Sequence, residues 1–225
     1  MNHINSLMDL LKTVQSYKDY LDGKVSFDQQ GRPVLKKEFF LDDWPDEMVT
    51  HQNRNSKLIT DKSKTLLCLF SPDRMIYPRF VKIYEEIDEY KQFYGVVSPD
   101  LTVTNDMDIE LQQLIIEANI LFMTVLAVNG VKVALNTRNG LISPEQCFQN
   151  IPKGVMCSSG FLGCARASDG LDSIRYLSKI LFLLPEKLAI YGKHDYEIEE
   201  GLDNVGIDYR RFDDFHAKTK KNRRN

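Results

Sequence analysis

The sequence predicts an α/β protein with a mainly parallel sheet, either open or rolled into a partial βα barrel. From Thr65 onward, short apolar runs of strand length alternate with longer segments of helical periodicity, a pattern typical of βαβ units. Two successive predicted strands also end in the same Ser-Pro-Asp turn, at residues 71–73 and 98–100. Proline lacks an N–H group and cannot continue a strand ladder, so both turns fit points where a strand leaves the sheet.

The individual elements follow from periodicity and from turn residues. Apolar residues at helical spacing predict a helix over residues 1–21. Residues 22–63 are polar and rich in turn formers, so we expect an irregular connection there. Asp108 offers a capping oxygen at the start of a long apolar helix, and Gly130 ends that helix. The predicted strands are 66–70, 95–98, 131–135, 154–158 and 187–191, and the later predicted helices are 78–93, 108–129 and 171–184.

Three regions result: an N-terminal helix and irregular region packed on the core (1–64), the α/β core (65–207) and a basic, disordered tail (208–225). Residues 218–225 carry five cations and no acid; removing them from the net charge of -3 leaves -8 on residues 1–217. An acidic body matches nucleic acid poorly. Contact with nucleic acid would therefore come from a local patch at the strand ends or from the tail, through Lys218, Lys220, Lys221, Arg223 and Arg224.

Composition indicates an ordinary globular protein, with 43% hydrophobic and 27% charged residues. It excludes fibrous, disulfide-framework and wholly disordered chains. Residues 1–11 lack the pattern of a signal peptide. The most apolar segment, 114–128, is shorter than the roughly 20 residues that span a bilayer, so we expect a buried helix and no membrane contact. Four cysteines without C-x-x-C spacing favour reduced thiols in a cytoplasmic protein.

Candidate catalytic residues follow the predicted strands, because ligands of parallel sheets and barrels bind beyond the carboxyl ends of the strands. Asp73 and Asp100 leave successive strands and could share a metal ion or divide acid and base roles. The alternative is that each carboxylate caps a turn. His194 could act as an acid or base near neutral pH, or be a solvated loop residue.

Candidate ligand-binding residues occupy the same strand ends. The small residues after Cys157 would let backbone amides approach a phosphate, although a loop packed on the sheet explains them equally well. Arg138 and Lys193 could supply positive charge. The sequence has no P-loop, G-x-G-x-x-G, G-x-S-x-G or histidine cluster, so we assign no metal and name no cofactor. The candidates are Ser98, Asn136, Arg138, Ser158, Ser159, Gly160 and Lys193.

Several short motifs form a further pattern: Ser-Pro-Asp-Leu-Thr at 98–102, Asn-Gly-Val at 129–131, Cys-Phe at 147–148, Ile-Pro-Lys-Gly at 151–154 and Ile-Tyr-Gly at 190–192. Over about residues 66–194 the chain thus resembles an uncharacterised family of bacterial, phage and prophage proteins. Leu101 stands where members of that family carry an aromatic residue. The family has no established activity, so the resemblance implies a phage or mobile-element setting in the cytoplasm of a bacterial host and names no reaction.

Our leading hypothesis is a mobile-element accessory protein that binds a small phosphorylated or nucleotide-like ligand at the carboxyl ends of its strands. Whether it also performs hydrolysis or transfer stays open. The alternative is a non-enzymatic protein that inhibits or recruits a host defence or replication factor, because no strong catalytic motif is present. A third hypothesis is nucleic-acid binding through the basic tail.

Overall fold

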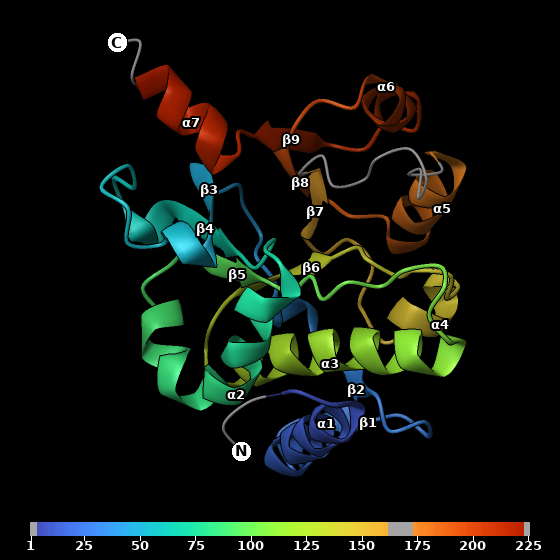
Figure 1. Cartoon of the computed structure of the whole chain (residues 1–225). Coiled ribbons are helices and arrows are strands. Elements are labelled where there is room, and N and C mark those ends of the chain that lie inside the picture. Colours follow the sequence, from blue (N-terminus) through green and yellow to red (C-terminus); the bar gives the residue numbers. More distant parts are fainter. Residues whose placement is uncertain (1–3, 162–172, 223–225) are drawn as a thin grey trace.

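The computed structural model describes residues 4–161 and 173–222. Seven parallel strands form one sheet in chain order, so every strand lies beside the one before it. Right-handed crossovers between such strands put the helices on one face and roll the sheet into a nearly closed barrel (Figure 1). The predicted parallel α/β fold is confirmed. The strands are β3 (Glu47–Thr50), β4 (Thr65–Cys68), β5 (Gly95–Val97), β6 (Val133–Asn136), β7 (Cys157–Phe161), β8 (Leu188–Gly192) and β9 (Tyr209–Phe212).

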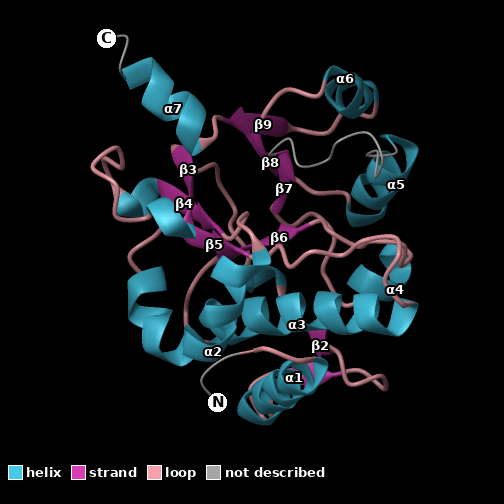
Figure 2. Ribbon diagram, in the orientation of Figure 1, coloured by secondary structure: helices cyan, strands magenta, loops and turns pink. Residues whose placement is uncertain are grey.

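The helices surround the strands, as the colours of Figure 2 show. A two-stranded antiparallel hairpin, β1 (Ser26–Phe27) with β2 (Pro33–Val34), lies beside the first helix. Two predicted boundaries shift. The helix expected from Pro78 begins five residues earlier, with Pro78 inside it, and the strand expected at 154–158 is β7. The helices are α1 (Leu7–Leu21), α2 (Asp73–Tyr90), α3 (Ile109–Val128), α4 (Pro144–Phe148), α5 (Ser173–Leu183), α6 (Tyr196–Asn204) and α7 (Phe215–Asn222).

Helix α3 forms the centre of the helical layer. It is 20 residues long and apolar enough to cross a membrane by length and composition. Most of its side chains are buried inside the protein, from Ile115 to Ala127, and α1 packs along its outer side (Figure 1). An apolar helix covered on both sides is the core helix of a soluble protein. The structure thus agrees with the buried helix that we expected at this position.

The sheet extends beyond the boundaries expected from sequence. β3 lies in the region expected to be irregular, and β9 and α7 occupy residues assigned to a disordered tail. β3 and β9 are not paired with each other. Side chains cover the seam between them: Arg210 lies 4.6 Å from the ring of Trp44, and Lys218 Nζ donates to Glu47 Oε2 and the carbonyl of Met48, both at 2.9 Å. The C-terminal segment therefore belongs to the folded body.

Two apolar clusters hold the barrel together. The larger lies between the sheet and the helices, and the smaller fills the inside of the barrel. Because side chains alternate along a strand, β3, β4, β5, β6 and β8 each supply both clusters. At the carboxyl ends of the strands, Phe70 and Tyr191 stack inside the barrel with ring centroids 6.1 Å apart. At the opposite end, Leu41 enters the interior beside Gly95. Both ends of the barrel interior are therefore filled with side chains.

Candidate functional site

The carboxyl ends of β5 and β6 are joined by an ion pair between Asp100 and Arg138. Arg138 donates from Nε to Oδ1 of Asp100 and from Nη2 to Oδ2, the latter at 3.1 Å. Asn136 supports the same carboxylate, because its Nδ2 donates to Asp100 Oδ1 at 2.8 Å. The side chain of Asp100 is 15% exposed and that of Arg138 is 36% exposed. The carboxylate thus lies beneath the guanidinium and fixes its orientation.

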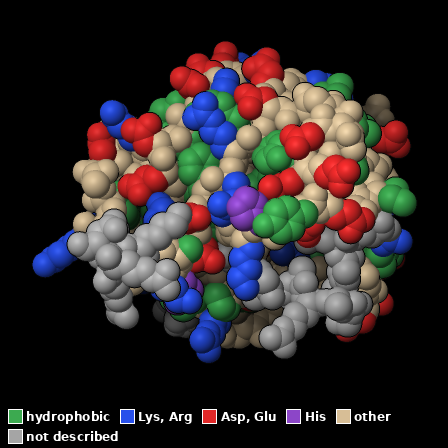
Figure 3. Space-filling view, turned by 90° about the horizontal axis from the view of Figure 1, so that it is seen from above, with side chains coloured by type: hydrophobic (Ala, Val, Ile, Leu, Met, Phe, Trp, Pro, Cys, Tyr) green, Lys and Arg blue, Asp and Glu red, His purple; other side chains and the backbone are tan. Residues whose placement is uncertain are grey.

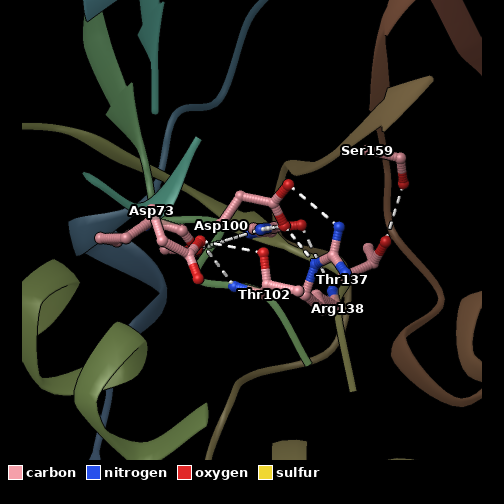
Figure 4. A network of polar contacts seen from close by, with 9 residues as sticks. Asp73, Asp100, Thr102, Thr137, Arg138 and Ser159 are labelled. Carbon is pink, nitrogen blue, oxygen red and sulfur yellow. Dashed lines mark hydrogen bonds and ion pairs between the residues drawn. The ribbon is translucent and has the colours of Figure 1, made fainter. Parts of the chain in front are cut away.

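Asp73 lies in the same network but has a different partner. Its Oδ1 accepts hydrogen bonds from the backbone N–H of Thr102 at 3.0 Å and from the Thr102 hydroxyl at 2.9 Å (Figure 4). These contacts tie the first turn of α2 to the loop after β5. The two aspartates therefore share one end of the barrel, as strand order suggested. Asp73 makes a loop-capping contact, which was the alternative interpretation of this residue.

Buried hydroxyls connect β6, β7 and α5 beside the ion pair. Thr137 Oγ1 lies 2.7 Å from Ser159 Oγ, which also accepts from the hydroxyl of Tyr176 at 2.9 Å. Two other candidates serve the sheet itself: Ser98 Oγ accepts from the backbone N–H of Asn136 at 2.7 Å, and Ser158 Oγ donates to the carbonyl of Ala189 at 2.9 Å. Ser98 is thus connected to the Asp100–Arg138 pair through Asn136, whereas Ser159 is bonded to Thr137, the residue before Arg138.

The small residues expected in a loop lie in a strand instead. Ser158, Ser159 and Gly160 are all within β7, so the prediction that the strand ends at Ser158 is wrong. A Cβ atom added to Gly160 would lie 2.9 Å from the ring of Phe70. The glycine is therefore required by close packing of an aromatic ring. The loop expected to cradle a phosphate falls partly on residues 162–172, which lie outside the described residues.

Lys193 and His194 lie after β8. The backbone N–H of Lys193 donates to the carbonyl of Phe161 at 2.9 Å, and its side chain is exposed. His194 Nδ1 is 3.0 Å from both carboxylate oxygens of Glu199, and its ring stacks on Tyr196. Within the described part of the chain, no hydrogen bond or ion pair links His194 to either candidate aspartate. His194 thus forms a separate surface group near α6.

Lys179 is a functional candidate that sequence reasoning missed. It lies on α5 one turn after Tyr176, and its Nζ is 5.0 Å from the centroid of that ring. Burial of the ammonium group and repulsion by Arg138 lower the pKa of Lys179 to about 8, while Asp100 acts in the opposite direction. Lys179 and Arg138 therefore lie near each other and near the carboxylate of Asp100, beside the hydroxyls of β6 and β7. A lysine with a perturbed pKa beside a strand end is a candidate site residue.

A family model for DUF4417, described as a domain of unknown function, matches residues 29–210. The chain belongs to this family. The match contains the whole range over which the sequence motifs suggested an uncharacterised family, so that prediction is confirmed. No curated protein and no solved structure matches the chain. We call the residues described above at the carboxyl ends of the strands the rim: Asp73, Asp100, Asn136, Thr137, Arg138, Ser159 and Lys179. All of them lie inside the range that the DUF4417 model matches.

Other candidates of this DUF4417 protein lie away from the rim. Lys218 is held by Glu47 and the carbonyl of Met48, so this tail lysine contributes to folding. Lys220 lies in α7, whereas the side chain of Lys221 and all of Arg223 and Arg224 lie outside the described residues. On the face shown in Figure 3, acidic and basic side chains are interspersed. In residues 4–161 and 173–222, no group of three His, Cys, Asp or Glu could hold a metal ion.

Proposed function

We propose that this DUF4417 protein binds a small phosphorylated or nucleotide-like ligand at the carboxyl ends of β5 to β7, with the phosphate group between Lys179 and Arg138. The observation that carries the proposal is that the guanidinium of Arg138 and the ammonium of Lys179 lie near each other at the carboxyl ends of the strands, beside the hydroxyls of Thr137 and Ser159. A phosphate is attracted by both cations and accepts several hydrogen bonds. Parallel βα barrels bind phosphates at this end of the strands.

Each neighbouring side chain has a part in the proposed site. Asp100 fixes the orientation of the guanidinium of Arg138. A guanidinium is planar and can donate to two phosphate oxygens at once. Lys179 contributes a compact positive charge from α5. The hydroxyls of Thr137 and Ser159 share one hydrogen bond, so one of the two keeps a proton that it can donate to a phosphate oxygen. Their burial lowers the local dielectric, which strengthens attraction to an anion.

The proposal concerns binding. Chemistry on the ligand would require a free acid or base, and the candidates for that role have protein partners. Asp73 accepts from Thr102, and His194 lies against Glu199. For the cellular setting, we propose an accessory protein of a phage or another mobile element in the bacterial cytoplasm. The support for this setting is the motif resemblance alone.

The proposal is tested by calorimetric titration with inorganic phosphate and adenosine monophosphate at low ionic strength. Lys179→Met should weaken binding of both ligands by at least about tenfold, because one charge-assisted hydrogen bond contributes about 1.5–3 kcal/mol. Lys187→Met is the matched control, since Lys187 lies at the opposite end of the barrel and donates to the carbonyl of Asp42. Equal affinities in the two variants, or no binding by the natural protein, would refute the proposal.

A further inference from the structure

A small polar pocket, separate from the proposed phosphate site, lies at the ends of β3 and β4, between α2 and the short helix η2 (His51–Asn53). Leu69, Met75 and Ile76 supply its apolar wall. The pocket encloses about 210 Å³ including its mouth, but only about 10 Å³ of this space admits the centre of a water molecule. A single water molecule needs about that much room. The pocket therefore fits one very small molecule.

Three buried polar atoms of this pocket have no hydrogen-bond partner among the residues that the structure describes: His51 Nε2, Ser71 Oγ and Arg79 Nε. The residue His51 is 7% exposed. An unsatisfied buried polar group costs about 1–3 kcal/mol, so native proteins rarely leave several together. Their three side chains come from three separate segments and line one pocket. A molecule bound in the pocket would satisfy them jointly.

The charges around the pocket cancel. Arg79 pairs with Glu86, Arg54 pairs with Glu89 at 2.7 Å, and the hydroxyl of Tyr90 donates to Glu86 at 2.8 Å. Burial and the nearby arginines lower the pKa of His51 to about 3, with Glu89 opposing them, so the imidazole is neutral at physiological pH. The pocket therefore has no excess positive charge for an anion. This distinguishes it from the rim at Lys179 and Arg138.

We propose that this pocket binds one neutral, water-sized hydroxylic molecule, which is water in the free protein. The molecule accepts from the Nε–H of Arg79 and exchanges hydrogen bonds with Ser71 and His51. A hydroxylic molecule suits these groups because it donates and accepts, whichever nitrogen of His51 carries the proton. Ser71 lies two residues before Asp73, whose carboxylate holds the loop after β5. The bound molecule thus braces the segment behind the proposed phosphate site.

Nuclear magnetic resonance tests this site directly through the Nε–H signal of Arg79, assigned by its loss in Arg79→Lys. In ¹⁵N-labelled protein, that proton should show a rotating-frame cross-peak to water with sign opposite to the diagonal. That sign identifies a dipolar contact with water protons and excludes proton exchange. No such cross-peak in the natural protein would overturn the proposal.

Substitutions at Ser71 then localise the water. Ser71→Ala removes the hydroxyl but keeps the space, so the cross-peak should persist. Ser71→Val fills the space, so the cross-peak should disappear while the Arg79 signal remains. Ser178→Ala, at an exposed position of α5, is the matched control and should leave the cross-peak unchanged. Loss of the cross-peak in Ser71→Ala, or its persistence in Ser71→Val, would overturn the proposal, because the signal would then come from the hydroxyl or from another place.

Discussion

The two ends of the barrel use basic residues differently. At the amino ends of the strands, Lys132 Nζ donates to the carbonyl of Glu38 at 2.7 Å, and Lys187 Nζ donates to the carbonyl of Asp42 at 2.8 Å. These lysines fasten the segment that covers the end of the barrel. At the carboxyl ends, Lys179 and Arg138 lie near each other and near the carboxylate of Asp100. The lysines at the amino ends thus bind backbone carbonyls, whereas the cations at the carboxyl ends gather where we propose that a phosphate binds.

Two glycines, one at each end of the barrel, show that the two ends also differ in packing. Gly95 lies beneath Leu41 at the amino end, and Gly160 lies beneath Phe70 at the carboxyl end. A Cβ on Gly95 would lie 2.8 Å from both the Leu41 side chain and the backbone carbonyl of Lys132, whereas the three atoms nearest to a Cβ on Gly160 all belong to the Phe70 ring. Backbone cannot move aside as a side chain can. The amino end should therefore tolerate less change.

Gly95→Ala should produce the largest loss of stability. The new methyl group overpacks a closed region, which costs about 3 kcal/mol. Leu41→Ala should not restore the loss, because the contact with the Lys132 carbonyl remains. Urea denaturation of the single and double variants measures both effects. Full recovery in the double variant would show that the backbone there is not rigid.

Gly160→Ala should cost about 2 kcal/mol, because its methyl group meets the ring of Phe70. Combining it with Phe70→Leu removes the ring that causes the clash. The double variant should then be more stable than the sum of the two single losses predicts, as a double-mutant cycle would reveal. Additive losses would contradict the packing that we describe at the carboxyl end.

Lys179→Met should raise stability at pH 7 while it weakens phosphate binding. Burial and repulsion by Arg138 lower the pKa of Lys179 from its usual 10.5 to about 8. Between these values the unfolded chain binds more protons than the folded one, so the natural protein should gain stability as pH rises from 8 to 10.5. The variant should lack this gain, and the advantage of Lys179→Met should shrink across the same window. Denaturation at pH 7, 9 and 10.5 checks this, with Lys187→Met as the control that keeps the gain.

The smallest expected effect is at Leu184, which follows α5 at the amino end of the barrel. Its φ of 46° lies in the left-handed region, which glycine adopts without strain, and its side chain is 53% exposed. Leu184→Gly should therefore stabilise the protein by about 0.5 kcal/mol after the entropy of the unfolded glycine is subtracted. Thermal denaturation measures the change. A clear loss of stability would mean that the leucine contributes more by packing than the strain costs.

Apolar periodicity predicted the inner strands of this sheet but not its edges. β3 has few apolar residues, and β9 contains Arg210 and Arg211. Those arginines belong in the sheet because Arg210 stacks on Trp44 and Arg211 donates to the carbonyl of Gly192. Such partners come from distant parts of the chain and cannot be predicted from the local sequence pattern. β7 was displaced for a similar reason, because its buried serines find partners in neighbouring elements.

The rim was predictable only where its residues follow strands. The rule that loops after parallel strands converge brought Asp100, Asn136 and Arg138 together correctly. It could not find Lys179, which reaches the rim from the middle of a helix. The only local signal was that Lys179 lies one turn after Tyr176. That spacing points to the rim only when it is known that Tyr176 donates to Ser159. His51 was missed because the strand before it was not predicted.

The most direct test of the central claim is the pKa of Lys179 with and without phosphate. The Cε chemical shift of Lys179 in ¹³C-labelled protein, assigned by its loss in Lys179→Met, follows the titration of this one residue. We expect a midpoint of about 8 in the free protein. Saturating inorganic phosphate should raise that midpoint by about one pH unit, because a nearby anion favours the charged amine. A midpoint near the usual value of 10.5 in the free protein, or one that phosphate does not move, would contradict the proposed site.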